Sequence, residues 1–67
     1  MQIDARGLSC PQPVINTQKA LKENPDGVEV LVDNVTARTN IERFARLNGY
    51  QVESQTENDS FLVKIWR

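Results

Sequence analysis

The spacing of hydrophobic residues changes repeatedly along this chain of 67 residues, and turn-forming residues stand at each change. Residues 11–23 place small or apolar side chains on one helical stripe. Residues 28–33 instead alternate apolar and polar side chains, as a half-buried strand does. Asn24-Pro25-Asp26-Gly27 between them is a strong stop and turn signal. Because each such element must bury one face, these changes constrain the fold more than any other feature.

The rest of the chain follows the same alternation. A second helix is predicted from about Val35 to Asn48, with Asp33-Asn34 supplying a capping residue and Gly49 suiting the left-handed position after the helix end. Residues 50–56 and 61–66 alternate again around a turn at 57–60, and residues 2–4 are a short strand candidate. The buried stripes expected on the helices are Val14, Thr17, Ala20 and Leu21 in the first and Ala37, Ile41, Phe44 and Ala45 in the second.

The predicted order is strand, helix, strand, helix, strand, strand. Two short helices must cover one face of a four-stranded mixed sheet, which is a two-layer α/β (α+β) sandwich. The first two strands should run parallel if they are neighbours, and the last two should form an antiparallel hairpin. Residues 1–67 have room for one domain with a modest core. Because the last alternating stretch runs to the final residue, we also consider that this domain is part of a longer protein.

Composition excludes several classes of function. The net charge of −1 gives no broad attraction to nucleic acid or to a membrane surface, and no apolar stretch approaches the roughly 20 residues that cross a bilayer. The glycines lack phosphate-loop spacing, and the acidic residues are too dispersed for a calcium loop. Arg38, Arg43 and Arg46 are expected to form a solvated helix face. The aromatic residues are expected in the core rather than on an RNA-stacking surface: Phe44, Tyr50, Phe61 and Trp66.

The chemistry available to the chain centres on one residue. Cys10 is its only cysteine, and histidine is absent. The chain therefore has no internal disulfide, no Cys–His pair and no imidazole metal ligand, so we expect no metal and no cofactor. One unpaired thiol fits a reducing compartment, which favours the cytoplasm.

The setting of Cys10 favours a reactive thiol over a small buried residue. It directly precedes Pro11, a residue favoured at the first helical position, and a helix N-terminus stabilises a thiolate. Pro11 and Pro13 lack N–H groups, so Gln12 and Val14 are the nearest backbone donors. Fewer hydrogen bonds leave a thiolate more nucleophilic. Just upstream, Arg6 is a candidate source of positive potential, and Gly7 allows a tight turn beneath the thiol.

The segment from Asp4 to Val14, DARGLSCPQPV, resembles the signature of the TusA/SirA-like sulfur-carrier family, whose core is Gly-Leu-x-Cys-Pro-x-Pro. The similarity continues through the order of helices and strands and covers essentially the whole chain. The end of the second predicted helix, Leu47-Asn48-Gly49-Tyr50, looks most like the YedF-like branch associated with selenium metabolism.

The resemblance implies a sulfurtransferase-type carrier that works with partner proteins. Such proteins accept sulfur as a persulfide on the motif cysteine from a cysteine desulfurase, then pass it to an acceptor protein in pathways such as tRNA thiolation. Their fold is similar to the C-terminal domain of translation initiation factor 3. Carried over to this chain, the catalytic residue is Cys10, supported by the motif residues Gly7, Leu8, Pro11, Gln12 and Pro13.

Two departures from the family pattern bear on partners. Many members carry an acidic-proline segment where this chain reads Asp33-Asn34-Val35-Thr36-Ala37, so contacts made there are expected to differ. Some members have a second cysteine where this chain has Ala45, so a persulfide formed here must leave to another molecule.

Several alternatives stay open at this stage. Candidate partner contacts are Arg6, Val14 and Ile15, although Leu8, Val14 and Ile15 are equally compatible with a place in the core. The alternative functions are a non-catalytic regulatory module that binds protein or RNA, and a carrier of selenium rather than sulfur.

Overall fold

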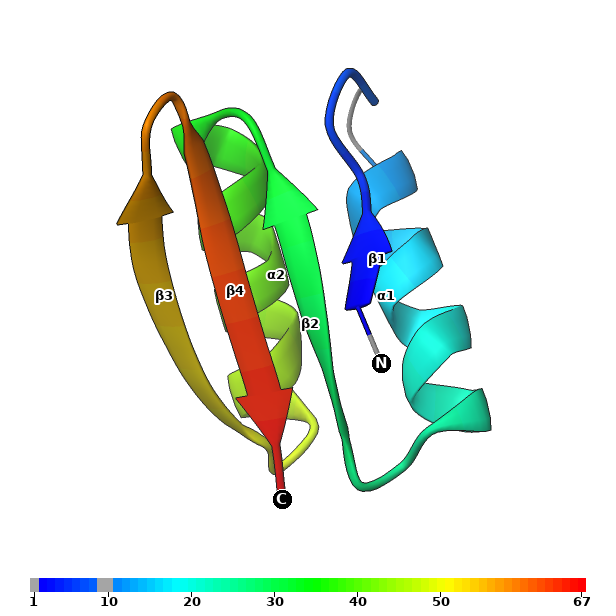
Figure 1. Ribbon diagram of the computed structural model, residues 1–67. Coiled ribbons are helices and arrows are strands. Elements are labelled where there is room, and N and C mark those ends of the chain that lie inside the picture. Colours follow the sequence, from blue (N-terminus) through cyan, green and yellow to red (C-terminus); the bar gives the residue numbers. More distant parts are fainter. Residues whose placement is uncertain (1, 9–10) are drawn as a thin grey trace.

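The computed structural model describes residues 2–8 and 11–67. In chain order they form β1 (Gln2–Asp4), α1 (Gln12–Glu23), β2 (Gly27–Val32), α2 (Val35–Leu47), β3 (Gln51–Glu57) and β4 (Ser60–Trp66). The strands make one sheet in the order β1-β2-β4-β3, and both helices cover the same face of it (Figure 1). The predicted two-layer sandwich is confirmed. Within the described ranges, neither helix is long and apolar enough to cross a membrane.

Strand pairing makes the sheet mixed. β1 runs parallel to β2, whereas β4 runs antiparallel to both β2 and β3. Val30 lies at the centre of the register, paired with Ile3 on one side and Val63 on the other. The parallel first pair and the terminal hairpin were both predicted, and both are confirmed. The position of β4 between β2 and β3 was not predicted from the sequence.

The core fills the space between the sheet and the two helices. On β2 the alternation predicted from the sequence holds, with Val28, Val30 and Val32 all buried. In α2, Ala37, Ile41 and Ala45 recur every fourth position and bury one stripe, as side chains at this spacing share a helix face. The buried residues of α1 are Pro13, Thr17, Ala20 and Leu21.

Two helical residues expected in the buried stripes lie at their margins instead. Val14 and Phe44 are half-buried and pack against the core from its edge. Val14 directly follows the fully buried Pro13, and Phe44 directly precedes the fully buried Ala45. Because successive residues point about 100° apart around a helix, each of the two lies to the side of the buried stripe. In α1 the buried position therefore belongs to Pro13, which the predicted stripe had omitted.

The other face of the sheet is not covered by a helix. It carries the residues that alternate with the buried ones, among them Lys64, whose partners in the register are Glu29 and Glu53. Trp66 also alternates onto this face, so the expectation that it belongs to the core was wrong. Phe44, Tyr50 and Phe61 do pack against the core.

Candidate functional site

Three loops meet at one end of the sheet, which we call the motif end. They are the loop between β1 and α1, described at residues 5–8 and 11 and called the motif loop, residues 33–34 between β2 and α2, and residues 58–59 between β3 and β4. They gather there because β1, β2 and β3 all point toward this end (Figure 1). The predicted catalytic residue, Cys10, belongs to the first of these loops by sequence, but it lies outside the described residues.

The first turn of α1 leaves backbone donors available. The helix begins at Gln12, one residue later than predicted, because Pro11 is the N-cap and its carbonyl accepts the Ile15 N–H at 3.1 Å. Pro13 occupies the second helical position and has no N–H. The N–H groups of Gln12 and Val14 are thus the first-turn donors that precede the helical hydrogen-bond ladder. The first turn contains no acidic residue and no side-chain cap, so its partial positive charge is not offset within the helix.

The motif residues occupy different environments. Gly7 has φ of +76° and is exposed, consistent with the tight turn predicted for it. Pro11 and Gln12 are exposed as well, and the Gln12 Nε2 donates to Asn16 Oδ1 at 2.8 Å. Pro13 is buried. Leu8 is half-buried and packs against the core.

Arg6 is occupied by a neighbouring carboxylate. Its Nη2 lies 2.9 Å from Asp4 Oδ2, and its Nε and backbone N–H both donate to Asp4 Oδ1 at 3.0 Å. These hydrogen bonds lower the pKa of Asp4 from 3.8 to about 2, and the carboxylate raises the pKa of Arg6. Because its charge is paired, Arg6 supplies less positive potential to the motif loop than the sequence alone suggests.

An acidic residue from the second loop holds the motif loop. Asp33 Oδ2 accepts the Gly7 N–H at 2.9 Å, and Asp33 Oδ1 accepts the Asn34 Nδ2 at 3.1 Å. The Asn34 Oδ1 in turn accepts the Ala37 N–H at 2.7 Å and caps α2, which confirms the predicted cap. From the sequence, Asp33 was expected only in the capping pair Asp33-Asn34 and in the segment 33–37 compared with the family pattern, and not as a partner of Gly7. A contact across 26 positions leaves no local pattern that could have revealed it.

Among Leu8, Val14 and Ile15, the apolar residues considered for partner docking, only Ile15 has an exposed side chain. Leu8 and Val14 pack against the core, whereas the Ile15 side chain in the first turn of α1 is 37% exposed. Val35, in the first turn of α2, is 54% exposed and was not singled out from the sequence. Both first turns lie at the motif end (Figure 1).

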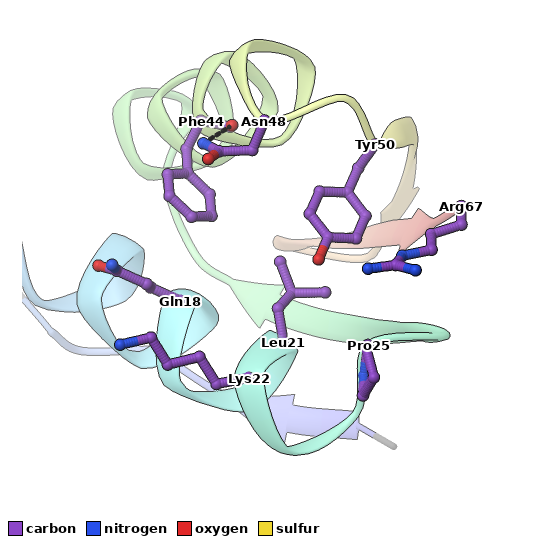
Figure 2. Close-up of a pocket in the computed structure, with 8 residues that line it drawn as sticks. All are labelled: Gln18, Leu21, Lys22, Pro25, Phe44, Asn48, Tyr50 and Arg67. Atoms are coloured by element: carbon purple, nitrogen blue, oxygen red, sulfur yellow. Dashed lines mark hydrogen bonds between the residues drawn. The ribbon is translucent and has the colours of Figure 1, made fainter.

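Two surface hollows lie at different ends of the described structure. One, of about 320 Å³, lies at the motif end between Arg6, Leu31 and the β3–β4 turn. The other, of about 300 Å³, lies toward the opposite end of the molecule, where both helices and the chain end (Figure 1), and Figure 2 shows its lining. Its lining comes from the C-terminal halves of both helices, from the residues that follow each helix and from the end of the chain: Gln18, Leu21, Lys22, Pro25, Phe44, Asn48, Tyr50 and Arg67. Its distance from the motif loop excludes it from the predicted site. Within residues 2–8 and 11–67, no three acidic side chains cluster closely enough to hold a metal ion.

Comparison with known proteins gives one consistent result. The family profile described as Sulfurtransferase TusA matches residues 1–67. A candidate sulfur carrier protein of Methanocaldococcus jannaschii is 44% identical over 61 residues, covering 88% of this chain and 81% of that protein. The sulfur carrier protein TusA of Pseudomonas syringae is 31% identical over 67 residues, covering 96% and 80%.

The fold comparison agrees with the sequence comparison. The crystal structure of a SirA-like protein from Desulfitobacterium hafniense superposes with a TM-score of 0.88 at 43% identity, covering 97% of this chain and 93% of that one. A full-length profile match, several relatives and a shared fold therefore point the same way. This chain belongs to the TusA family of sulfur carriers.

Proposed function

We propose that Cys10 carries sulfane sulfur as a persulfide, received from a cysteine desulfurase-like donor and passed to an acceptor protein. The observation that carries this proposal is the start of α1. Its first turn, which begins two residues after Cys10 in the sequence, presents two backbone donors with no carboxylate and no side-chain cap. Such a terminus favours the anionic form of a nearby thiol.

The proposed transfer needs no external oxidant or reductant. The Cys10 thiolate attacks the outer sulfur of the donor persulfide, a new sulfur–sulfur bond forms at Cys10, and the donor cysteine leaves as a thiolate. The second transfer repeats this step with Cys10 as the leaving thiolate. Because the chain has a single cysteine, no internal thiol competes for the persulfide, and the sulfur leaves to another molecule.

Partner docking is proposed at the same end of the molecule. Ile15 and Val35 offer exposed apolar side chains in the first turns of the two helices, where a donor or acceptor must approach Cys10. Arg6 remains a candidate contact, with its guanidinium already bonded to Asp4. The acidic-proline segment of many family members corresponds to residues 33–37 here, so we propose that partner choice differs from theirs.

Mass spectrometry after incubation with a cysteine desulfurase and cysteine tests the proposal. We expect one added sulfur atom on the wild-type chain and none on Cys10→Ser. Ile15→Asn, which removes the apolar side chain without adding a charge to the first turn of α1, is expected to slow this loading while leaving Cys10 free to react with a small alkylating reagent. An unloaded wild-type chain, or equal loading of Cys10→Ser, would favour the non-catalytic binding module instead.

The same loading assay distinguishes a selenium carrier from a sulfur carrier. Resemblance of residues 47–50 to the YedF-like branch motivates replacing cysteine with selenocysteine as the source. If this chain is a selenium carrier, the adduct on Cys10 should form preferentially from selenocysteine. If it is a general sulfur carrier, cysteine should load it at least as fast.

A further inference from the structure

Two backbone N–H groups of the motif loop donate to β2 and to the loop that follows it. The Ala5 N–H donates to the Leu31 carbonyl at 2.8 Å and extends the β1–β2 pairing by one residue. Two residues later, the Gly7 N–H donates to Asp33 Oδ2 at 2.9 Å. The first attachment is ordinary strand pairing. The second depends on one side chain from a different loop.

Gly7 lies in a turn, three positions before Cys10 in the sequence. Its φ of +76° places it in the left-handed region, which favours glycine, and a side chain there would meet open space. The turn is therefore not enforced by crowding around Gly7. The Arg6 N–H, which donates to Asp4 Oδ1, supports the turn from the β1 side. The Gly7 N–H donates to a carboxylate of another loop, and charge-assisted bonds of this kind are among the stronger ones in proteins.

Asp33 is itself held on the other side. Its second oxygen accepts the Asn34 amide, and the Asn34 carbonyl oxygen caps α2 through the Ala37 N–H. A continuous chain of hydrogen bonds therefore runs from the start of α2 to the motif loop. The rigid helix sets the position of the carboxylate, and the carboxylate sets the position of Gly7.

We infer that Asp33 is a positioning residue for sulfur transfer, holding the Cys10 loop against the start of α2 through the Gly7 amide. This inference rests on the proposed function, since it assigns Asp33 a role in the reaction of the same thiol. Correct placement of a nucleophile contributes strongly to rate, so a looser loop should slow sulfur acceptance. The role requires an oxygen acceptor at position 33, and the negative charge strengthens the hydrogen bond without being essential to it.

A pair of substitutions separates the acceptor from the charge. Asp33→Asn removes the charge but keeps an oxygen that can accept the Gly7 N–H, whereas Asp33→Ala removes both. We expect Asp33→Ala to slow loading of Cys10 by about tenfold, the scale of one lost charge-assisted hydrogen bond. Asp33→Asn should stay within about threefold of wild type, because an oxygen acceptor remains. Asp59→Ala is the matched control, since it removes an acidic side chain at the same end without touching Gly7.

Two further measurements do not depend on sulfur transfer. Hydrogen exchange of the Gly7 amide, followed by NMR, should accelerate in Asp33→Ala and change little in Asp33→Asn. The rate at which iodoacetamide alkylates Cys10 should differ from wild type in Asp33→Ala and stay close to wild type in Asp33→Asn and Asp59→Ala. Circular dichroism at the assay temperature establishes that each variant is folded.

The outcomes distinguish this inference from the proposed function. A wild-type chain that accepts no sulfur overturns the proposed function, while Gly7 exchange and alkylation still decide whether Asp33 positions the loop. If Asp33→Ala matches wild type in both of these, the positioning role is wrong. Equal effects of Asp33→Ala and Asp33→Asn on loading would also overturn it, because charge alone would then explain them.

Discussion

Of the three glycines, Gly27 is the one at which a side chain would meet neighbouring atoms. It has φ of +147°, and a Cβ atom there would lie 2.6 Å from the Ile65 carbonyl oxygen. We therefore expect Gly27→Ala to lower the free energy of unfolding by about 1–3 kcal/mol, the usual cost of forcing atoms into a packed site. Urea denaturation measures this change.

Gly49 provides the control for that substitution. It has φ of +82° with open space around it, and asparagine is tolerated in this region of backbone conformation. Gly49→Asn should therefore cost clearly less than Gly27→Ala. Equal losses from the two substitutions would contradict the role assigned to the Ile65 carbonyl.

The Asp4–Arg6 pair predicts a specific dependence on pH. Because folding lowers the pKa of Asp4 from 3.8 to about 2, the ionised carboxylate stabilises the folded state. That contribution is fully present above pH 3.8 and is lost as the pH falls toward about 2. Wild type should therefore lose its stability advantage over Asp4→Asn in this acidic range, measured by thermal unfolding. A difference that stays constant across the range would contradict the pairing.

Features of single residues could be predicted from the sequence when they depend on neighbouring residues, but not when they depend on residues distant in the chain. The left-handed Gly49 and the turn at Gly7 were predicted from their immediate neighbours, and both are confirmed. The Asp33–Gly7 hydrogen bond and the contact between Gly27 and Ile65 were not predicted. Each joins residues that are far apart in sequence, so only the folded arrangement brings them together.

At the scale of single elements, the cap of α2 yields a direct test. Asn34 Oδ1 accepts the Ala37 N–H, which is one of the first-turn donors that no helical carbonyl can satisfy. Asn34→Ala should lower the free energy of unfolding by about 1 kcal/mol, whereas Asn34→Ser keeps an acceptor and should cost less. Chemical denaturation of the two variants measures the difference. A loss as large for serine as for alanine would show that capping is not the stabilising interaction.

Element boundaries followed closely from local signals. α2 was expected at Val35–Asn48 and spans Val35–Leu47, with Asn48 as its C-cap. The start of α1 was placed one residue early because Pro11 is acceptable both as an N-cap and as a first helical residue. Only the hydrogen bond from Ile15 to its carbonyl decides between the two.

At the scale of the whole molecule, the strand order was the part that local patterns did not settle. β3 and β4 both alternate, so either could have lain beside β2. The distinguishing signal is that β4 also buries Leu62 on its outer face, whereas β3 is polar and has no buried residue. Burial on both faces is typical of an interior strand, and a polar strand of an edge.

Because both helices and the sheet share one core, truncating one central side chain should destabilise the whole fold. Ile41 is fully buried between α2 and the sheet. Ile41→Ala should therefore cost about 2–5 kcal/mol, a large share of the stability of a domain this small. Ile15→Ala makes the same chemical change at a side chain that is 37% exposed and should cost much less. Similar losses in urea denaturation would contradict the assigned core.

The central claim, that this chain is a carrier whose one thiol takes up sulfur and gives it away, is tested most directly by following labelled sulfur. The chain is loaded by a desulfurase with isotopically labelled cysteine, separated from the donor, and mixed with a thiol acceptor while its intact mass is recorded. We expect the added sulfur to leave Cys10 for the acceptor and the emptied chain to load again. Label that never reaches Cys10, or that stays there in the presence of the acceptor, would contradict the account.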